Sequence, residues 1–228
     1  MYTLYIANKN YSSWSLRPWV LMHALAIPFE ERLVCFEPGS SWDKFRAFSP
    51  SGRVPCLHDE GNVIWDSLAI IEYLAERHPG VWPGSESTRA WARSAASEMH
   101  SGFAELRGRC PMNCGLRIKL KEIGEPLRAN LTRIDEIWSE GIDRFGGPFL
   151  TGPGFGAVDA FFAPVVFRAQ TFNLPFGAAA RSYVELMLSQ AAMQEWYQAA
   201  LSEPWREASH ESEVAATGIV RADFRTKA

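Results

Sequence analysis

Two short stretches in the N-terminal third of the chain combine a proline, a carboxylate and a hydroxyl in places that suit a small charged ligand. Val54-Pro55 opens a short apolar run that we expect to be a strand, and a proline there has no N–H to give the sheet. A cis bond before Pro55 would turn Val54 outward, where its N–H and C=O could pair with an extended peptide. Asp66-Ser67 precedes residues with helical periodicity, and the free N–H groups of a helix start can hold a carboxylate. Together these features predict a small peptide as the ligand.

Ser12 and Ser13 stand just before another expected helix. Backbone N–H groups and the positive end of the helix dipole favour an anion at such a place. A hydroxyl there can donate to a thiolate and so lower the pKa of a bound thiol, which matters because the thiolate is the nucleophile. Taken without the two stretches above, this pair would be an ordinary serine N-cap.

These residues carry a resemblance to a known family. The stretch 49–72 resembles the glutathione-binding half of a glutathione transferase N-terminal domain, and residues 11–17, YSSWSLR, are similar to the Ser-Ser-Cys-x-x-Arg signature of the zeta class. That class includes the maleylacetoacetate isomerases. Ser12, Ser13 and Arg17 match the signature, whereas Trp14 stands where the class has cysteine.

The resemblance implies roles for the matching residues. It implies that Ser12 activates the thiol of glutathione, although counting four residues back from Arg17, as in other serine-type classes, indicates Ser13. It also implies that Val54, following the pattern with Pro55, pairs with the cysteinyl part of glutathione.

The ends of the tripeptide would meet charged and polar side chains. By the same resemblance, Asp66 faces the γ-glutamyl ammonium and Ser67 its carboxylate. Arg53 and Lys44 are the nearby cations that could meet the glycyl carboxylate. Each of these two cations, taken alone, is better explained as a solvated surface charge.

The electrophile would contact residues outside these motifs. A helix expected to begin near Ala90 places His100, Phe103 and Arg107 on one face at three- and four-residue steps, together with Met99 and Leu106. We take Trp14, His100, Phe103 and Arg107 as candidate substrate contacts. A lone histidine on such a face is more often a structural residue.

The order of elements predicts the fold. Strand, helix, strand, helix, hairpin and helix within residues 1–78 are typical of a thioredoxin-like α/β domain, with Ser12-Ser13-Trp14-Ser15 where redox members have C-x-x-C. A stretch rich in proline and glycine, 78–84, marks the boundary. From residue 86 to 228 we expect an all-α domain with helices at 90–109, 126–145, 157–172 and 181–201, and a polar, irregular tail from about 203. This is the architecture of the glutathione transferases, and the resemblance covers nearly the whole chain.

One expected helix start in the second domain has an unusual cap. Asp159 lies three residues after Gly156, where the family pattern has a hydroxyl residue. A glycine cap offers no side-chain acceptor, so we expect Asp159 to carry the stabilisation of this helix start. The neighbouring glycines do not predict a nucleotide site, because no βαβ unit surrounds them.

Composition excludes several classes of function. The 228 residues carry a net charge of −3, which argues against a nucleic-acid footprint or a basic membrane patch. The four cysteines form no C-x-x-C pair and lack histidine partners at metal-binding spacing, so we expect reduced thiols and no metal. No targeting or membrane-spanning segment is apparent, and we expect a cytoplasmic protein.

We therefore expect a serine-type glutathione transferase, in which glutathione is the co-substrate and a small electrophile is the partner. A homodimer is expected because the family dimerises. One alternative is a non-catalytic binding or scaffolding module with this fold. Another is a glutathione-dependent isomerase of the maleylacetoacetate isomerase type, for which Trp14 is a poor replacement for cysteine because indole has only one N–H donor and no nucleophile.

Overall fold

A four-stranded mixed sheet forms the N-terminal part of the computed structural model, which describes residues 1–226. The strands lie in the order β2-β1-β3-β4, with β1 parallel to β2 and the other pairs antiparallel. The strands are β1 (Tyr2–Ile6), β2 (Phe29–Leu33), β3 (Cys56–Asp59) and β4 (Asn62–Ile64), and the helices are α1 (Ser13–Ala24), α2 (Trp42–Arg46) and α3 (Ser67–Ala75). The expected thioredoxin-like order is confirmed, and the Val54-Pro55 bond directly before β3 is cis, as expected.

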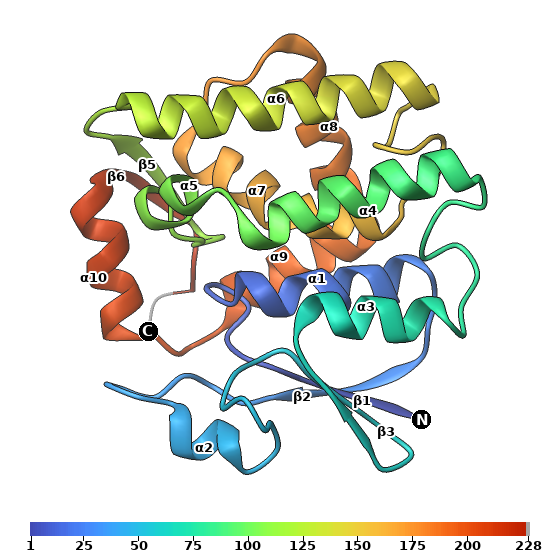
Figure 1. Cartoon of the computed structure of the whole chain (residues 1–228). Helices are drawn as coiled ribbons and strands as arrows, with labels where there is room; N and C mark the ends of the chain where they lie inside the picture. The colour runs from blue at the N-terminus through green and yellow to red at the C-terminus, as the bar shows by residue number, and fades with distance from the viewer. Residues whose placement is uncertain (227–228) are drawn as a thin grey trace.

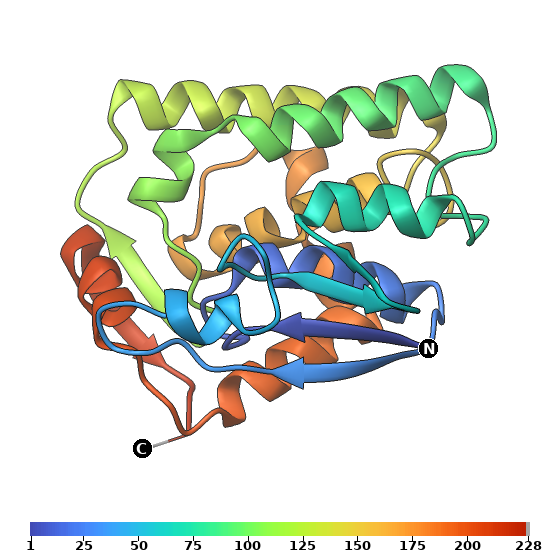
Figure 2. The ribbon, with the colours of Figure 1, turned by 60° about the horizontal axis from the view of Figure 1, so that its bottom comes forward.

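Helices form most of the remaining chain. They are α4 (Glu86–Ser101), α5 (Ala104–Arg109), α6 (Glu125–Phe145), α7 (Ala157–Phe172), α8 (Ala178–Ser189), α9 (Ala191–Ser202) and α10 (Ala208–Thr217). Figures 1 and 2 show α1 and α3 on one face of the sheet, with α4 and α7 beyond them and α6 farthest from the sheet. Helix α9 packs beside α1. The two parts of the chain therefore meet along α1.

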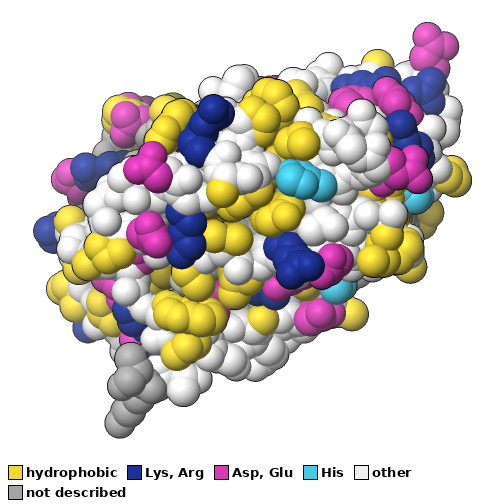
Figure 3. All heavy atoms as spheres, turned by 90° about the horizontal axis from the view of Figure 1, so that it is seen from below, with side chains coloured by type: hydrophobic (Ala, Val, Ile, Leu, Met, Phe, Trp, Pro, Cys, Tyr) yellow, Lys and Arg dark blue, Asp and Glu magenta, His cyan; other side chains and the backbone are white. Residues whose placement is uncertain are grey.

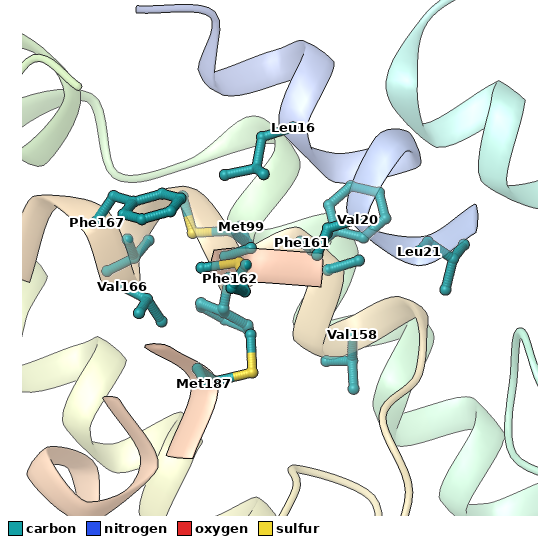
Figure 4. Close-up of a cluster of buried hydrophobic side chains, with 14 of the residues drawn as sticks. Leu16, Val20, Leu21, Met99, Val158, Phe161, Phe162, Val166, Phe167 and Met187 are labelled. Carbon is teal, nitrogen blue, oxygen red and sulfur yellow. The ribbon is translucent and has the colours of Figure 1, made fainter. Parts of the chain in front are cut away.

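The core is continuous across this boundary and is centred on α7. Nearly every residue of α7 is buried, which is the pattern of a helix surrounded by protein on all sides. Leu16 and Val20 of α1 and Met99 of α4 share one cluster with Phe161 and Phe162 of α7 (Figure 4). Because interiors are close-packed and transmit small shifts, this shared core fixes the start of α1 relative to the helical part.

The helix expected over residues 90–109 is in fact two helices. Phe103 has φ 60° and ψ 40°, so the chain turns between α4 and α5. Arg107 completes the end of α4: its Nε donates to the carbonyl of Gly102 at 3.0 Å, and Nη2 donates to the carbonyls of Met99 and His100. The sequence pattern missed this break because the stabilising contact comes from a side chain beyond it.

The helix expected over residues 181–201 is also divided, at Gln190, whose backbone is extended with ψ 137°. The break lets the two pieces pack on different neighbours. Tyr183 and Met187 of α8 are buried towards α6 and α7, whereas Met193 and Trp196 of α9 are buried towards α1.

The structure corrects two further expectations. The predicted helical second part is confirmed as an architecture, but it is not helical throughout, because β5 (Leu116–Leu120) and β6 (Gly218–Asp223) form a two-stranded antiparallel sheet. The segment after residue 203 is not an irregular tail. Helix α10 and β6 fold back onto the body, and Arg225 pairs with Glu211 at 2.5 Å and with Asp223 at 2.7 Å. The alternation of apolar and basic residues in LRIKL was the available signal for β5.

Surface charge is mixed. Lys or Arg and Asp or Glu alternate over the face shown in Figure 3, without a large field of one sign. Within residues 1–226, no helix has the length and apolar character needed to cross a membrane, and no group of three His, Cys, Asp or Glu side chains is placed to hold a metal ion. All four cysteines are free.

Asp159 organises the start of α7 from a fully buried position. Its carboxylate accepts from the N–H of Leu150 at 3.1 Å, the N–H of Gly156 at 2.9 Å and the hydroxyl of Tyr183 at 2.9 Å. Burial raises the pKa of Asp159 to about 6, although the hydrogen bonds favour the carboxylate. Asp159 thus joins the 149–156 loop, the α7 start and α8, which is more than the cap expected from the sequence.

Replacing Asp159 by alanine would leave these three buried donors without an acceptor. At about 1–3 kcal/mol for each unsatisfied group, we expect Asp159→Ala to lower the free energy of unfolding by about 3 kcal/mol or more. Tyr183→Phe removes one donor together with its demand, so it should cost only about 1 kcal/mol. Urea unfolding of the two single variants and the double variant measures this. The double variant should lose less free energy of unfolding than the sum of the losses in the two single variants. Strict additivity would contradict the hydrogen bond between Tyr183 and the Asp159 carboxylate.

Candidate functional site

A cavity of 530 Å³ opens where the sheet part meets the helical part. Its walls come from the start of α1, the 36–42 segment, the turn before β3, α5 with the residues after it, one residue of α7, and the start of α10. The lining residues used below are Tyr11, Ser12, Ser13, Trp14, Trp42, Arg53, Val54, Arg107, Arg168, Glu207 and His210.

The loop leading into α1 is held by residues of the helical part. The side chain of buried Glu203 accepts from the N–H of Lys9 at 2.6 Å and of Asn10 at 3.2 Å. Trp196 Nε1 donates to the carbonyl of Lys9 at 2.9 Å, and Gly115 N donates to Asn10 Oδ1 at 3.2 Å. These bonds fix the backbone directly before Ser12, so the start of α1 is positioned by contacts more than 100 residues away in the chain.

Both serines face the cavity but differ in their contacts. Ser12 is the N-cap of α1 and is 5% exposed, and its Oγ donates to Ser15 Oγ at 2.7 Å. Ser13 is the first residue of α1 and is half-buried. Its hydroxyl has no hydrogen-bond partner within residues 1–226.

The turn before β3 brings Arg53 and Val54 to the opposite wall. Gly52 has φ 62°, and a Cβ there would lie 2.5 Å from the ring of Trp42, so a glycine is needed on both counts. Trp42 is half-exposed and covers this turn at the edge of the cavity. Val54 therefore lines the same cavity that the serines face.

Asp66 and Ser67 lie at the start of α3, outside the lining of this cavity. Asp66 caps α3 by accepting from Leu68 N at 3.0 Å, and its other oxygen lies 3.2 Å from His100 Nε2. Ser67 is fully buried, and Arg17 Nη1 donates to its hydroxyl at 3.4 Å.

Trp14 lies between the Asp66-Ser67 pair and the cavity. The guanidinium of Arg17 is 4.2 Å from the Trp14 ring centre, that of Arg107 is 4.7 Å from it, and the His100 ring meets it edge-on at 5.2 Å. Burial lowers the pKa of His100, although Asp66 opposes this shift. The indole is thus held by two cations and joins the motifs that the sequence indicated separately.

Besides Asp66 and Ser67, other predicted site residues, among them Arg17 and Pro55, lie outside the lining of this cavity. Phe103 is in the core at 8% exposure and does not line the cavity, and His100 reaches it only through Trp14. Lys44 is outside the lining, with its Nζ 3.2 Å from Glu37 Oε1. The face expected for His100, Phe103 and Arg107 assumed an unbroken helix; with the turn at Phe103, that residue enters the core, whereas His100 and Arg107 both still meet the Trp14 ring.

Sequence reasoning missed the contribution of α10. Glu207 caps α10 by accepting from Ser209 N at 3.2 Å and His210 N at 2.9 Å, and it also binds His210 Nδ1 at 2.6 Å. The His210 ring stacks on the Tyr11 ring, with 4.9 Å between the ring centres. The Tyr11 hydroxyl donates to Glu211 at 2.7 Å. An acidic residue followed at short range by serine and histidine was the available capping signal.

A larger cavity of 710 Å³ lies between α3, the 78–84 segment and the loop before α7. Its charged side chains are already engaged within the chain. Arg93 pairs with Glu72 at 2.9 Å, Arg89 donates to the carbonyl of Gly84 at 2.7 Å, and His78 binds the hydroxyl of Tyr2 at 2.9 Å. The residues that could activate a thiol all face the smaller cavity.

Comparison with known proteins gives consistent results. Residues 11–77 match the family model described as glutathione S-transferase, N-terminal domain. A probable maleylacetoacetate isomerase of Caenorhabditis elegans is 28% identical over 177 residues, covering 72% of this chain and 79% of that protein. A zeta-class glutathione S-transferase of Euphorbia esula is 26% identical over 168 residues, covering 72% and 75%.

Solved structures agree on the fold. A glutathione transferase homologue from Burkholderia, solved with bound glutathione, superposes with a TM-score of 0.66 at 23% identity, covering 87% of this chain and 97% of that one. A tau-class glutathione S-transferase from mango has a TM-score of 0.66 at 18% identity, covering 94% and 96%.

The Glu207 cap makes α10 sensitive to acid. Although burial alone would raise it, hydrogen bonds from Ser209 and His210 lower the pKa of Glu207 to about 2. A carboxyl whose pKa is lowered by folding stabilises the folded state at pH values above its ordinary pKa of 4.5. This stabilisation is lost as the pH falls from 4.5 towards the folded-state pKa of about 2. We expect Glu207→Gln at pH 7 to lower the protection of the amides of residues 208–217 against hydrogen exchange, and acid should lower the same protection, relative to the intrinsic exchange rate at each pH, in the unmodified chain.

The matched control is Glu213→Gln, on the same helix but exposed. It should leave exchange in α10 nearly unchanged. Equal acceleration in both variants would show that loss of negative charge, and not loss of the cap, loosens α10.

Proposed function

We propose that this chain, which belongs to the glutathione transferase family and has zeta-like relatives, is an enzyme that activates the thiol of glutathione for attack on a small electrophile. The observation that carries the proposal is the pair of serine hydroxyls at the α1 start, facing a 530 Å³ cavity that Val54 also lines. A thiol placed there meets a helix N-terminus and hydroxyl donors, both of which favour its thiolate.

Glutathione would bind along the sheet side of the cavity. Its cysteinyl backbone would pair with Val54, and Arg53, which lines the same wall, would meet the glycyl carboxylate. The γ-glutamyl end would reach the α3 start, where the Asp66 side chain is 53% exposed and can face an ammonium. Lys44 is the weaker candidate for the glycyl end because it is already paired with Glu37.

The hydrogen bonds support Ser13 as the donor to the thiolate. A serine hydroxyl has a single proton, and Ser12 uses its proton on Ser15 Oγ. The Ser13 hydroxyl has no such commitment within residues 1–226, and Ser13 is the first residue of α1 and lines the cavity. Ser12, which the zeta signature favours, would then hold the shape of the turn.

A glutathione-dependent isomerase is the second candidate, because one relative is a probable maleylacetoacetate isomerase. Trp14 argues for conjugation instead. The indole is fixed between Arg17 and Arg107, supplies no thiol, and narrows the space beside the serines. We further propose that the enzyme acts in the cytoplasm as a homodimer, as expected for the family.

The serine assignment is tested by two alanine variants. We expect Ser13→Ala to lower kcat/KM with a reactive aryl halide by about 10²–10³-fold, as is typical when one anion-stabilising donor is removed. The ultraviolet absorbance of the bound thiolate, followed against pH, should show a raised thiol pKa in the same variant. Ser12→Ala serves as the comparison and should change both quantities much less.

The opposite pattern, a raised thiol pKa only in Ser12→Ala, would return the role to Ser12. Unmodified protein that binds glutathione without forming the thiolate near neutral pH would contradict the proposed activity altogether. Brisk turnover of maleylacetoacetate would overturn the argument from Trp14.

A further inference from the structure

Three arginines, Arg17, Arg107 and Arg168, gather beside the cavity without a carboxylate partner. Arg17 is 1% exposed and Arg168 is 4% exposed, and Arg107 lies half-buried next to them. Within residues 1–226, none of the three is within 4.0 Å of an acidic oxygen. Burying charge is costly unless it is paired, so an unpaired cluster of this size needs an explanation.

Two of the three cations have other groups around them. Arg17 lies over the rings of Trp14 and Phe161 and donates to Ser67. Arg107 completes the end of α4 and also lies over the Trp14 ring. Both arginines therefore stabilise the fold through these contacts.

Arg17 also has an unpartnered Nε, but only Arg107 and Arg168 line the cavity, and Arg168 is the more deeply buried of these two. Its one hydrogen bond within residues 1–226 runs from Nε to the carbonyl of Cys110 at 2.7 Å, which fixes the guanidinium plane and leaves both Nη groups without a partner. Burial lowers its pKa to about 10, and the positive charge of Arg107 adds to this. No carboxylate of the described chain offsets that repulsion.

Arg168 and Arg107 line the cavity on its helical side, with Pro111 and Met112. This wall faces the space beyond the serines, whereas Val54 and Arg53 belong to the sheet side proposed for glutathione. Of the three acidic residues of the lining, Glu37 pairs with Lys44 and Glu207 binds His210, and the third, Glu213, is exposed on α10 and pairs with neither arginine. The free cationic groups of the helical wall thus remain open to a ligand.

We propose that Arg168, assisted by Arg107, binds a carboxylate of the second substrate, so that the enzyme prefers electrophiles bearing an anionic group. The inference rests on the proposed function, because it names the class of molecule that the thiolate attacks. A planar guanidinium with both Nη groups available matches a carboxylate in two parallel hydrogen bonds. Such a ligand also removes the repulsion between the two cations, and it holds the electrophilic carbon in a fixed orientation towards the thiolate.

The test compares two matched electrophiles, 4-chloro-3-nitrobenzoate and 4-chloro-3-nitrobenzamide, which differ in charge and hardly in shape. The variant is Arg168→Gln, whose amide can still donate to the Cys110 carbonyl. We expect its kcat/KM for the benzoate to fall by about 10- to 100-fold, as befits loss of charge-assisted hydrogen bonds, with less than about a twofold change for the benzamide.

Arg109→Gln is the matched control. It removes the same charge from α5, two residues from Arg107, but its side chain is exposed and lies outside the cavity. It should leave the preference for the benzoate intact. Equal losses in the two variants would show that Arg168 acts only through the overall field, and this would overturn the inference.

Direct binding separates failure of this inference from failure of the proposed function. Calorimetry of glutathione-loaded protein with 3-nitrobenzoate and 3-nitrobenzamide, which have no leaving group, requires no turnover. Tighter binding of the benzoate, lost in Arg168→Gln, supports the inference even if no chloride is displaced. Equal affinities for the benzoate and the benzamide overturn the inference. It is also overturned if Arg168→Gln raises the pKa of the bound glutathione thiol and lowers the rates with both electrophiles equally, because Arg168 would then act on the thiolate.

Discussion

The site depends on the hydrogen bonds by which the helical part holds the loop of residues 8–10 in place. Glu203, Trp196 and Gly115 hold this loop through its backbone and the Asn10 side chain, and the loop leads directly into Ser12 and Ser13. A hydroxyl stabilises a thiolate only when its position is fixed, since the benefit of a preorganised donor disappears if it must move to reach the charge. The chemistry proposed for the sheet part thus relies on residues of the other part.

The shared core serves the same end on a larger scale. Because α7 is buried on all sides and packs on α1, the helical wall with Arg168 and the serine wall are joined through one packed core. Trp14 joins the two parts at the cavity itself, since it starts from α1 and is clasped by Arg107 of α5. A site between two parts of a chain acquires precision only if their interface is as well packed as a core.

The sequence could predict what local chemistry determines. Val54-Pro55, Asp66-Ser67 and the serine pair were visible because a turn, a cap and a helix start each need particular residues close together in the chain. Arg168 and His210 were not visible, since each joins the cavity only through packing with segments distant in sequence. The breaks at Phe103 and Gln190 escaped for a related reason: helical periodicity continues through both, and contacts from elsewhere decide the turn.

The fold-back of the last segment changes how the end of the chain should be regarded. Its polar composition invites removal in a shortened version for expression, ending near residue 203. Such a version would lose the partner of Tyr11, a strand of the small sheet and one wall of the cavity, and a cut before Glu203 would also release the loop that leads to the serines. The N-terminal part could then retain its sheet without activating a thiol, so the folding of a shortened chain is not evidence that it is functional.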